Sequence, residues 1–201
     1  MGRPKKNKDN NDTEKALLQA ATEVFGRDGF QAASLSEISV KVGVTRTTLL
    51  YYFKSKENIY SEIIKEAFTK LATELLGSIE IGGTASSQIT RVVKRFLDYV
   101  EKYPSIAKLM LRELIDESKP GSLFIIDQGL PVLELVENFF MEVGQLAPSQ
   151  RPLLREVLLQ IMTSVMVKSA VGPSRDRIWG KKSKTRELAS ILLDGLIAGG
   201  R

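Results

Sequence analysis

The chain has 201 residues, of which 43% are hydrophobic and 26% are charged, values typical of a soluble globular protein with one domain or two small ones. It contains no cysteine and no histidine. These absences exclude disulfides and thiolate chemistry, and they remove the commonest metal ligand and proton shuttle, so we expect no cofactor, no metal site and no enzyme. Carboxylates remain at Asp98, Glu113 and Asp116, where basic neighbours on helical stretches predict a solvated, salt-bridged face.

The formal net charge of +5 is unevenly distributed along the chain. Residues 1–8 carry four positive charges and no acid, and residues 173–186 carry six positive charges against one acid, so the remainder is net negative. A mildly acidic body with basic appendages is typical of a protein that touches a polyanion at defined places.

The first twelve residues predict a disordered basic arm, because GRPKKNKDNND offers nothing apolar to a core. Arg3 and Lys5 can lie along DNA phosphates or in a narrow minor groove, although a solubilising tail is equally consistent with the composition. The stretch has no apolar segment typical of a secretion signal, so a cytoplasmic location is expected.

A first helix is expected from Thr13 to just before Gly29, where it would brace the elements that follow. Its apolar face consists of Leu17, Ala21, Val24 and Phe25.

Residues 34–56 predict a helix-turn-helix. Ser34 and Glu37 have the spacing of a capping box, and Gly43 follows the last apolar residue, where a left-handed turn is expected. Thr45 can then cap a second short helix. The apolar members of the two helices are Leu35, Ile38 and Val42 in the first and Leu49, Leu50 and Phe53 in the second.

The first turn of the second helix is polar, which favours a role in DNA recognition over a helical hairpin that only packs in a core. Core packing would not need polar side chains there. Thr45, Arg46 and Thr47 are expected to face base edges. Thr48, Tyr51, Lys54 and Lys56 are expected to hold phosphates.

The stretch GVTRTTLLYYFKSKENIY resembles the pattern Gly-Val-Ser-x-x-Thr-Leu-Tyr-x-His-Phe-x-Ser-Lys-Glu of the tetracycline-repressor (TetR) family, and the resemblance is dense over residues 13–62. Leu50 stands where the family usually has a phosphate-contacting tyrosine, and Tyr52 stands where it usually has histidine. We therefore expect the phenol of Tyr51 to make the phosphate contact.

The resemblance implies an all-α fold with a three-helix DNA-binding domain over residues 13–56 and a helical effector-binding and dimerisation domain over residues 57–201. It also implies a homodimer that binds a palindromic DNA operator and responds to a small-molecule effector. Repression is the expected mode of regulation, although activators share the fold.

Ser55 is expected to cap a continuous helix that ends near Leu76 and is roughly 30 Å long. Apolar residues recur along this helix at intervals of four. The helix would join the DNA-binding domain to the rest of the chain. These apolar residues are Ile59, Ile63, Ala67, Leu71 and Leu75.

Beyond a loop at residues 77–84 the sequence predicts only helices, at residues 87–103, 105–118, 123–144, 149–171 and 185–198. Pro131 should kink or divide its helix. No strand pattern, internal repeat or membrane-spanning run is apparent.

The last two predicted helices are apolar on more than one side, which favours a four-helix bundle between two subunits over two core helices of a monomer. The predicted interface residues are Val157, Ile161, Val165, Leu188, Leu192 and Gly195.

The middle helices are rich in aromatic and methionine side chains that can either line a largely apolar effector pocket or fill a core. The pocket candidates are Phe96, Tyr99, Tyr103, Met110, Phe124, Phe139, Met162 and Met166. The main functional hypothesis is a ligand-responsive transcription regulator. The alternative is an all-helical enzyme or effector-binding protein that retains a helix-turn-helix as a scaffold, although the missing His and Cys disfavour an enzyme.

Overall fold

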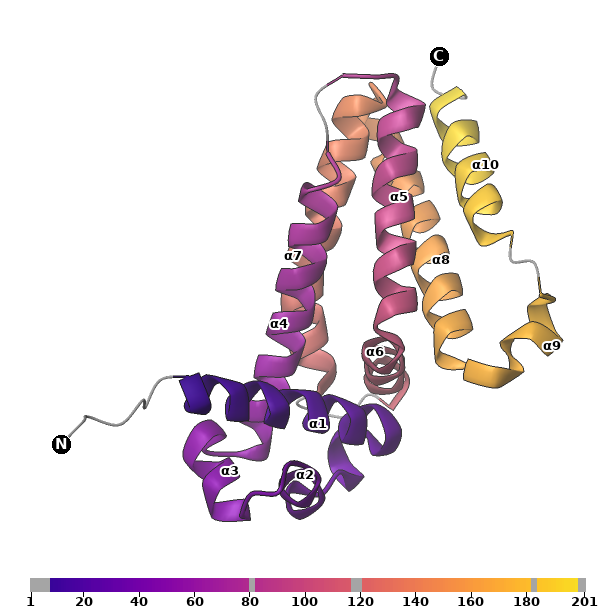
Figure 1. Ribbon diagram of the computed structural model, residues 1–201. Helices are drawn as coiled ribbons and strands as arrows, with labels where there is room; N and C mark the ends of the chain where they lie inside the picture. Colours follow the sequence, from indigo (N-terminus) through magenta and orange to yellow (C-terminus); the bar gives the residue numbers. More distant parts are fainter. Residues whose placement is uncertain (1–7, 80–81, 117–120, 182–183, 199–201) are drawn as a thin grey trace.

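The computed structural model describes residues 8–79, 82–116, 121–181 and 184–198, which form helices and loops without any strand. A head of three helices lies at one end, and a body of long helices stands on it (Figure 1). The head consists of α1 (Lys8–Ala32), α2 (Leu35–Val42) and α3 (Arg46–Phe53).

The first helix begins earlier than the sequence predicted. Residues 8–12 belong to α1, so the expected arm is wrong for them, while Arg3 and Lys5 lie outside the described residues. At the other end, Gly29 has φ 78° and ψ 173°, which breaks the helix where its end was predicted.

The brace role of α1 is confirmed by its burial. Its four predicted apolar side chains are all 0% exposed, and they belong to the same core as Ile38, Leu49 and Phe53 of the helix-turn-helix. Full burial of one large apolar side chain stabilises a fold by about 1.5–3 kcal/mol, so α1 largely determines whether the two short helices hold together.

The body contains α4 (Lys56–Leu76), α5 (Ala85–Lys102), α6 (Pro104–Asp116), α7 (Gly121–Val143), α8 (Arg151–Ala170) and α10 (Thr185–Ala198). The long helix α4 is confirmed, and its five periodic apolar residues are all buried. Helix α7 continues through Pro131, so the expectation that this proline divides its helix is wrong. Pro131 is exposed, so the carbonyl that loses its helical donor there can be hydrated.

Two short segments were not predicted: η2 (Gly172–Ser174) and α9 (Arg175–Trp179). They are too short, at three and five residues, to show a helical period in the sequence. The start of the helix predicted over residues 149–171 is the 3-10 turn η1 (Pro148–Gln150), which leads into α8. Among the described residues no single helix is long and apolar enough to cross a membrane. One pair of helical segments bent by 110°, Pro148–Ala170 with Gly172–Trp179, has the length and composition of a span when the two are taken together.

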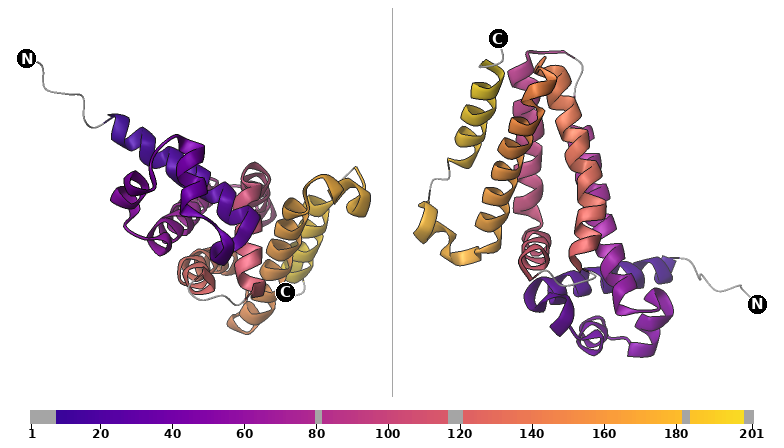
Figure 2. Two further views of the ribbon diagram at one scale, coloured as in Figure 1. Left: turned by 90° about the horizontal axis from the view of Figure 1, so that it is seen from below. Right: turned by 180° about the vertical axis from the view of Figure 1, so that it is seen from behind.

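The body helices pair in two rows, which the opposite views of Figures 1 and 2 show. Helix α7 lies behind α4, and α8 lies behind α5, while α10 covers the outer side. The short helix α6 lies against α1, where the body meets the head.

The junction of α1 and α6 is close and polar. A Cβ on Gly26 would approach the Ser105 carbonyl oxygen to 2.9 Å, so only glycine permits this separation. Beyond the Gly29 break, the Phe30 backbone N–H donates to Glu113 Oε1 at 2.9 Å, and the Arg112 guanidinium donates to the Arg27 carbonyl. The end of α1 is thus held by two charged side chains of α6.

This contact corrects the expectation for the carboxylates. Glu113 is 1% exposed, so it does not lie on a solvated face. Helical periodicity could not predict the burial of Glu113, because the backbone N–H that its carboxylate meets is 83 residues away in the sequence. Asp98 does form the expected ion pair, with Arg186 at 2.6 Å, whereas the side chain of Asp116 lies outside the described residues.

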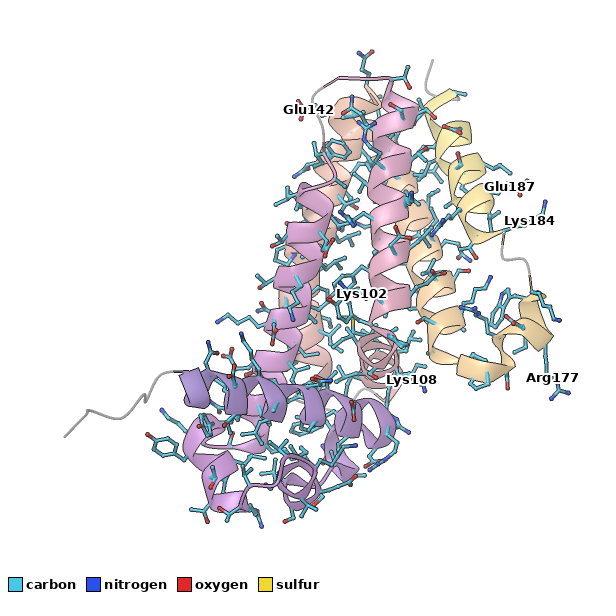
Figure 3. All side chains as sticks on the ribbon, viewed as in Figure 1. Lys102, Lys108, Glu142, Arg177, Lys184 and Glu187 are labelled. Carbon is cyan, nitrogen blue, oxygen red and sulfur yellow. The ribbon has the colours of Figure 1, made fainter. Side chains whose placement is uncertain are left out.

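Glu113→Ala should lower the free energy of unfolding by about 1–3 kcal/mol, because the Phe30 N–H would remain buried without an acceptor. The control is Glu142→Ala, which removes an exposed carboxylate at the far end of the body (Figure 3) and should change the stability by less than about 0.5 kcal/mol. Urea denaturation of both variants measures the difference. Equal effects would show that the Glu113 contact does not stabilise the junction.

Candidate functional site

The turn between α2 and α3 has the predicted geometry. Ser34 Oγ accepts from Glu37 N at 3.4 Å, and Gly43 is left-handed with φ 74° and ψ 27°. Only the Ser34 half of the expected capping box is seen, because the Glu37 carboxylate accepts from Arg27 Nη2 at 2.8 and 2.9 Å. That ion pair attaches α2 to α1 and fixes the orientation of the turn.

Helix α3 presents one buried side and one exposed side. Leu49 and Phe53 are buried, whereas Arg46, Thr47 and Tyr51 are exposed, the last to 79%. The exposed side is therefore the predicted reading surface, made of donors and acceptors on a short helix.

Two predicted contact residues also organise the start of α3. Thr45 is its N-cap, since Thr45 Oγ1 accepts from Thr48 N at 3.0 Å. The two hydroxyl oxygens are 2.8 Å apart and share a hydrogen bond. Thr45 is exposed and can still meet a base edge, whereas Thr48 is half-buried beside it.

The link between α3 and α4 is a strained turn at Lys54. This residue has φ 57° and ψ −43°, and the Ser55 N–H donates across it to the Phe53 carbonyl at 2.5 Å. Such a γ-turn with positive φ is rare for a residue with a side chain. It turns the chain sharply, so the exposed Lys54 lies between the reading helix and the long helix.

Lys56 is less available than the sequence indicated. Its Nζ donates to the Gln31 carbonyl at 2.9 Å and lies 5.1 Å from the centroid of the Phe30 ring. Burial lowers the pKa of this ammonium. A phosphate contact by Lys56 stays a prediction, and it requires the ammonium to leave Gln31. Ser55 caps α4 as predicted, accepting from Asn58 N at 3.1 Å.

An apolar cavity lies inside the body between α4, α5, α7 and α8, with a volume of about 50 Å³. Of the predicted pocket residues, Phe96 and Met162 line it. Sequence reasoning missed Phe68 and Gly129, which meet across the cavity, since a Cβ on Gly129 would lie 3.0 Å from the Phe68 ring. The only signal was a glycine within an otherwise apolar helical pattern. The remaining lining is aliphatic apart from Phe140: Leu71, Leu75, Val92, Val93, Val132, Leu133, Val136, Leu158 and Ile161.

Six predicted pocket residues lie elsewhere. Met110 and Met166 are buried in the core, Phe124 packs 6.3 Å from Tyr60, and Phe139 packs 5.7 Å from Phe140. Tyr99 and Tyr103 line a separate groove at the surface. Periodicity located the apolar faces of these helices, but it could not show which neighbouring helix each face meets. No group of three or more metal-ligating side chains occurs in the described part of the chain.

The predicted interface residues fall into three groups. Ile161 and Val165 are buried within the subunit, so we revise their assignment, while Val157 and Leu192 are half-buried. Leu188 is 51% exposed, and the space around Gly195 is open. The neighbouring Ile191, which was not among the predicted interface residues, is 61% exposed.

A family model described as "Bacterial regulatory proteins, tetR family" matches residues 17–63. The uncharacterized HTH-type transcriptional regulator YdgC of Bacillus subtilis (strain 168) is 38% identical over 140 residues, which cover 66% of this chain and 71% of that protein. HTH-type transcriptional regulator RutR of Escherichia coli (strain K12) is 30% identical over 101 residues, covering 50% of this chain and 47% of that protein. The chain thus spans about half the length of RutR.

The fold is also similar to a solved structure, the transcriptional regulator FadR from Bacillus subtilis in complex with stearoyl-CoA. The TM-score is 0.69 at 20% sequence identity, and the superposition covers 92% of this chain and 98% of that one. At this identity the similarity extends to the fold alone.

The strained turn gives a testable consequence for stability. Lys54→Gly should be more stable than Lys54→Ala by about 1 kcal/mol, because glycine adopts the positive φ without steric cost while both variants lose the same side chain. Thermal unfolding monitored by circular dichroism compares the two. A glycine variant less stable than the alanine variant would contradict the presence of strain at this turn.

Proposed function

The chain belongs to the TetR family of transcriptional regulators, and on this basis we propose that it is a dimeric repressor that leaves its operator when it binds a small, largely apolar ligand. The observation that carries DNA binding is the exposed polar side of α3, whose opposite side is anchored by Leu49 and Phe53. A packing helix would not need that arrangement.

We assign base reading to the first turn of α3 and phosphate contacts to its flanks. Arg46 has a planar fork of donors that matches the two acceptors on a guanine edge, and Thr45 and Thr47 lie beside it. Tyr51 and Lys54 are exposed further along the chain, where they can meet the backbone of the groove. Arg3 and Lys5 are proposed as additional phosphate or minor-groove contacts.

The proposed dimer interface is the outer face of α8 and α10. Apolar side chains are exposed there on both helices. Gly195, near the end of α10, has no side chain, so a partner helix can approach closely there. Exposed apolar side chains clustered on one side of a protein mark an interaction surface. The proposed residues are Leu159 and Val167 of α8 and Leu188, Ile191, Leu192 and Gly195 of α10.

The proposed effector site is the apolar cavity. At about 50 Å³ it is far below the roughly 300–1,000 Å³ of ordinary ligand sites, so a ligand must spread the surrounding helices to enter. Its lining is almost entirely apolar, and a polar ligand group there would lose its hydration without gaining a hydrogen bond. The stearoyl-CoA bound by FadR supports a ligand with a long apolar chain.

We propose that α4 couples the two sites. Phe68, Leu71 and Leu75 line the cavity from the far half of this helix, and the reading helix joins its near end. A dimer can contact both half-sites only when its reading helices are about 34–36 Å apart, so a ligand that spreads α4 would disturb that spacing. The coupling equals the difference in ligand affinity between the two states.

Two variants test DNA binding, and they should differ in whether the loss of affinity depends on the DNA sequence. Arg46→Ala should cost about 1–3 kcal/mol at particular base pairs of the operator. Lys54→Ala should weaken binding to all sequences alike and reduce the salt dependence by about one unit, because it removes one phosphate contact. Fluorescence anisotropy with the DNA upstream of the protein's own gene and with scrambled DNA measures both effects.

Equal losses on operator and scrambled DNA for both variants would show that the roles are assigned incorrectly. A wild-type protein that does not distinguish operator from scrambled DNA would overturn the proposal of a sequence-specific repressor.

Dimerisation is tested by Ile191→Asp, which should separate the subunits because it buries an unpaired carboxylate in the interface. The variant should sediment as a monomer and bind operator much more weakly, although α3 is unchanged. Ile115→Asp is the control, since Ile115 of α6 is 76% exposed and lies outside the proposed face. A wild-type protein that already sediments as a monomer would refute the interface.

A further inference from the structure

A second and larger space lies at the junction of head and body. It is a groove of about 680 Å³ bounded by α1, α4 and the corner between α5 and α6. The ribbons of α1, α4 and α5, which contribute most of its lining, form the sides of a triangle in Figure 1. Its volume is within the roughly 300–1,000 Å³ of small-molecule sites without any movement of the helices. The apolar part of its lining consists of Leu18, Ile63, Ala67, Tyr99, Tyr103 and Ile106.

The groove is separate from the apolar cavity of the body, and no residue lines both. The Tyr99 hydroxyl donates to the Ala67 carbonyl at 2.6 Å, which joins α5 to α4 between the two spaces. Phe68, the next residue of α4, belongs to the cavity side. A ligand in the groove therefore meets different side chains from a ligand in the cavity.

The charge of the groove is unbalanced towards cations. Its lining contains three lysines and two glutamates. Glu66 pairs with Lys70 at 2.5 Å, and Glu23 pairs with Lys41, outside the groove, at 3.0 Å. Within the part of the chain that the structure describes, no carboxylate pairs with Lys15 or Lys102.

The aromatic part of the groove lies beside one of these lysines. Tyr99 and Tyr103 have ring centroids 4.9 Å apart, and Lys102 Nζ lies 5.2 Å from the centroid of the Tyr103 ring. Lys102 is labelled in the opening between α4 and α5 in Figure 3. A positive charge thus stands directly next to an apolar, aromatic surface.

We infer that this groove binds a small aromatic carboxylate. The ring would lie against Tyr99, Tyr103 and Ile106, and the carboxylate would pair with Lys15 and Lys102. An aromatic ring gains both buried area and favourable ring contacts on such a surface. The two ammonium groups favour an anion over a neutral molecule, because a charge-assisted hydrogen bond is roughly twice as strong as a neutral one.

The occupant would touch α1 of the head and α5 of the body at the same time. It would therefore act on their relative orientation directly, without entering the body. The site does not depend on the proposed DNA-binding function. It is inferred from the groove, from its aromatic side chains and from two lysines that pair with no carboxylate among the described residues.

The test is isothermal titration calorimetry of the full chain with 2-naphthoate. We expect the double variant Lys15→Met and Lys102→Met to bind at least tenfold more weakly than the wild type, because methionine keeps the apolar stem and removes the charge. Lys65→Met is the matched control, since Lys65 is an exposed lysine of α4 outside the groove, and it should bind like the wild type. Lys102→Arg should retain binding, because it preserves the positive charge.

The ligand can be varied in the same way, which keeps the test valid if the double variant fails to fold. The neutral analogue 2-naphthylmethanol should bind the wild-type protein at least tenfold more weakly than 2-naphthoate. Wild-type protein that does not bind 2-naphthoate at millimolar concentration would overturn the proposal. Equal binding of the acid and the alcohol, or equal binding by the wild type and a folded double variant, would also overturn it.

Discussion

The structure depends on the burial of α1 between the helix-turn-helix and the body. Phe25 and Phe30 both meet the ring of Tyr60 edge-on at 5.0 Å, and Tyr60 meets Phe124 at 6.3 Å. Tyr60 is 0% exposed, and burial raises the pKa of its hydroxyl. This aromatic cluster joins α1 to α4 and α7, so the helix that supports the reading surface is also part of the body core.

Besides this aromatic cluster, the head has two other attachments to the body that differ in chemistry. The first is the continuous backbone of α4, which is stiff because each turn is hydrogen-bonded to the next. The second is the polar contact of Glu113 with the Phe30 N–H and of Arg112 with the Arg27 carbonyl. Movement of α4 alone would strain the second attachment, so a change in the body must either carry α6 along or break that contact.

The cavity and the groove share two helices, α4 and α5, but differ in chemistry. On α4, Phe68 and Leu71 face the apolar cavity, whereas Ile63 and Ala67 face the groove beside the lysines. The cavity is small and apolar, while the groove is larger and its lining has more lysines than glutamates. The hydrogen bond from Tyr99 to Ala67 joins α5 to α4, the two helices that line both spaces.

The sequence by itself determined the features that depend on neighbours within a few residues. Ser34, Thr45 and Ser55 cap their helices, Gly43 is left-handed, and α4 has its predicted extent, because caps, turns and periodicity are local. Only the tertiary structure decided which apolar side chains line the cavity, which interface candidates point inward, why Glu113 is buried, and why the Lys56 ammonium meets Gln31. These outcomes depend on contacts between distant segments, and periodicity specifies that a face is apolar without specifying what covers it.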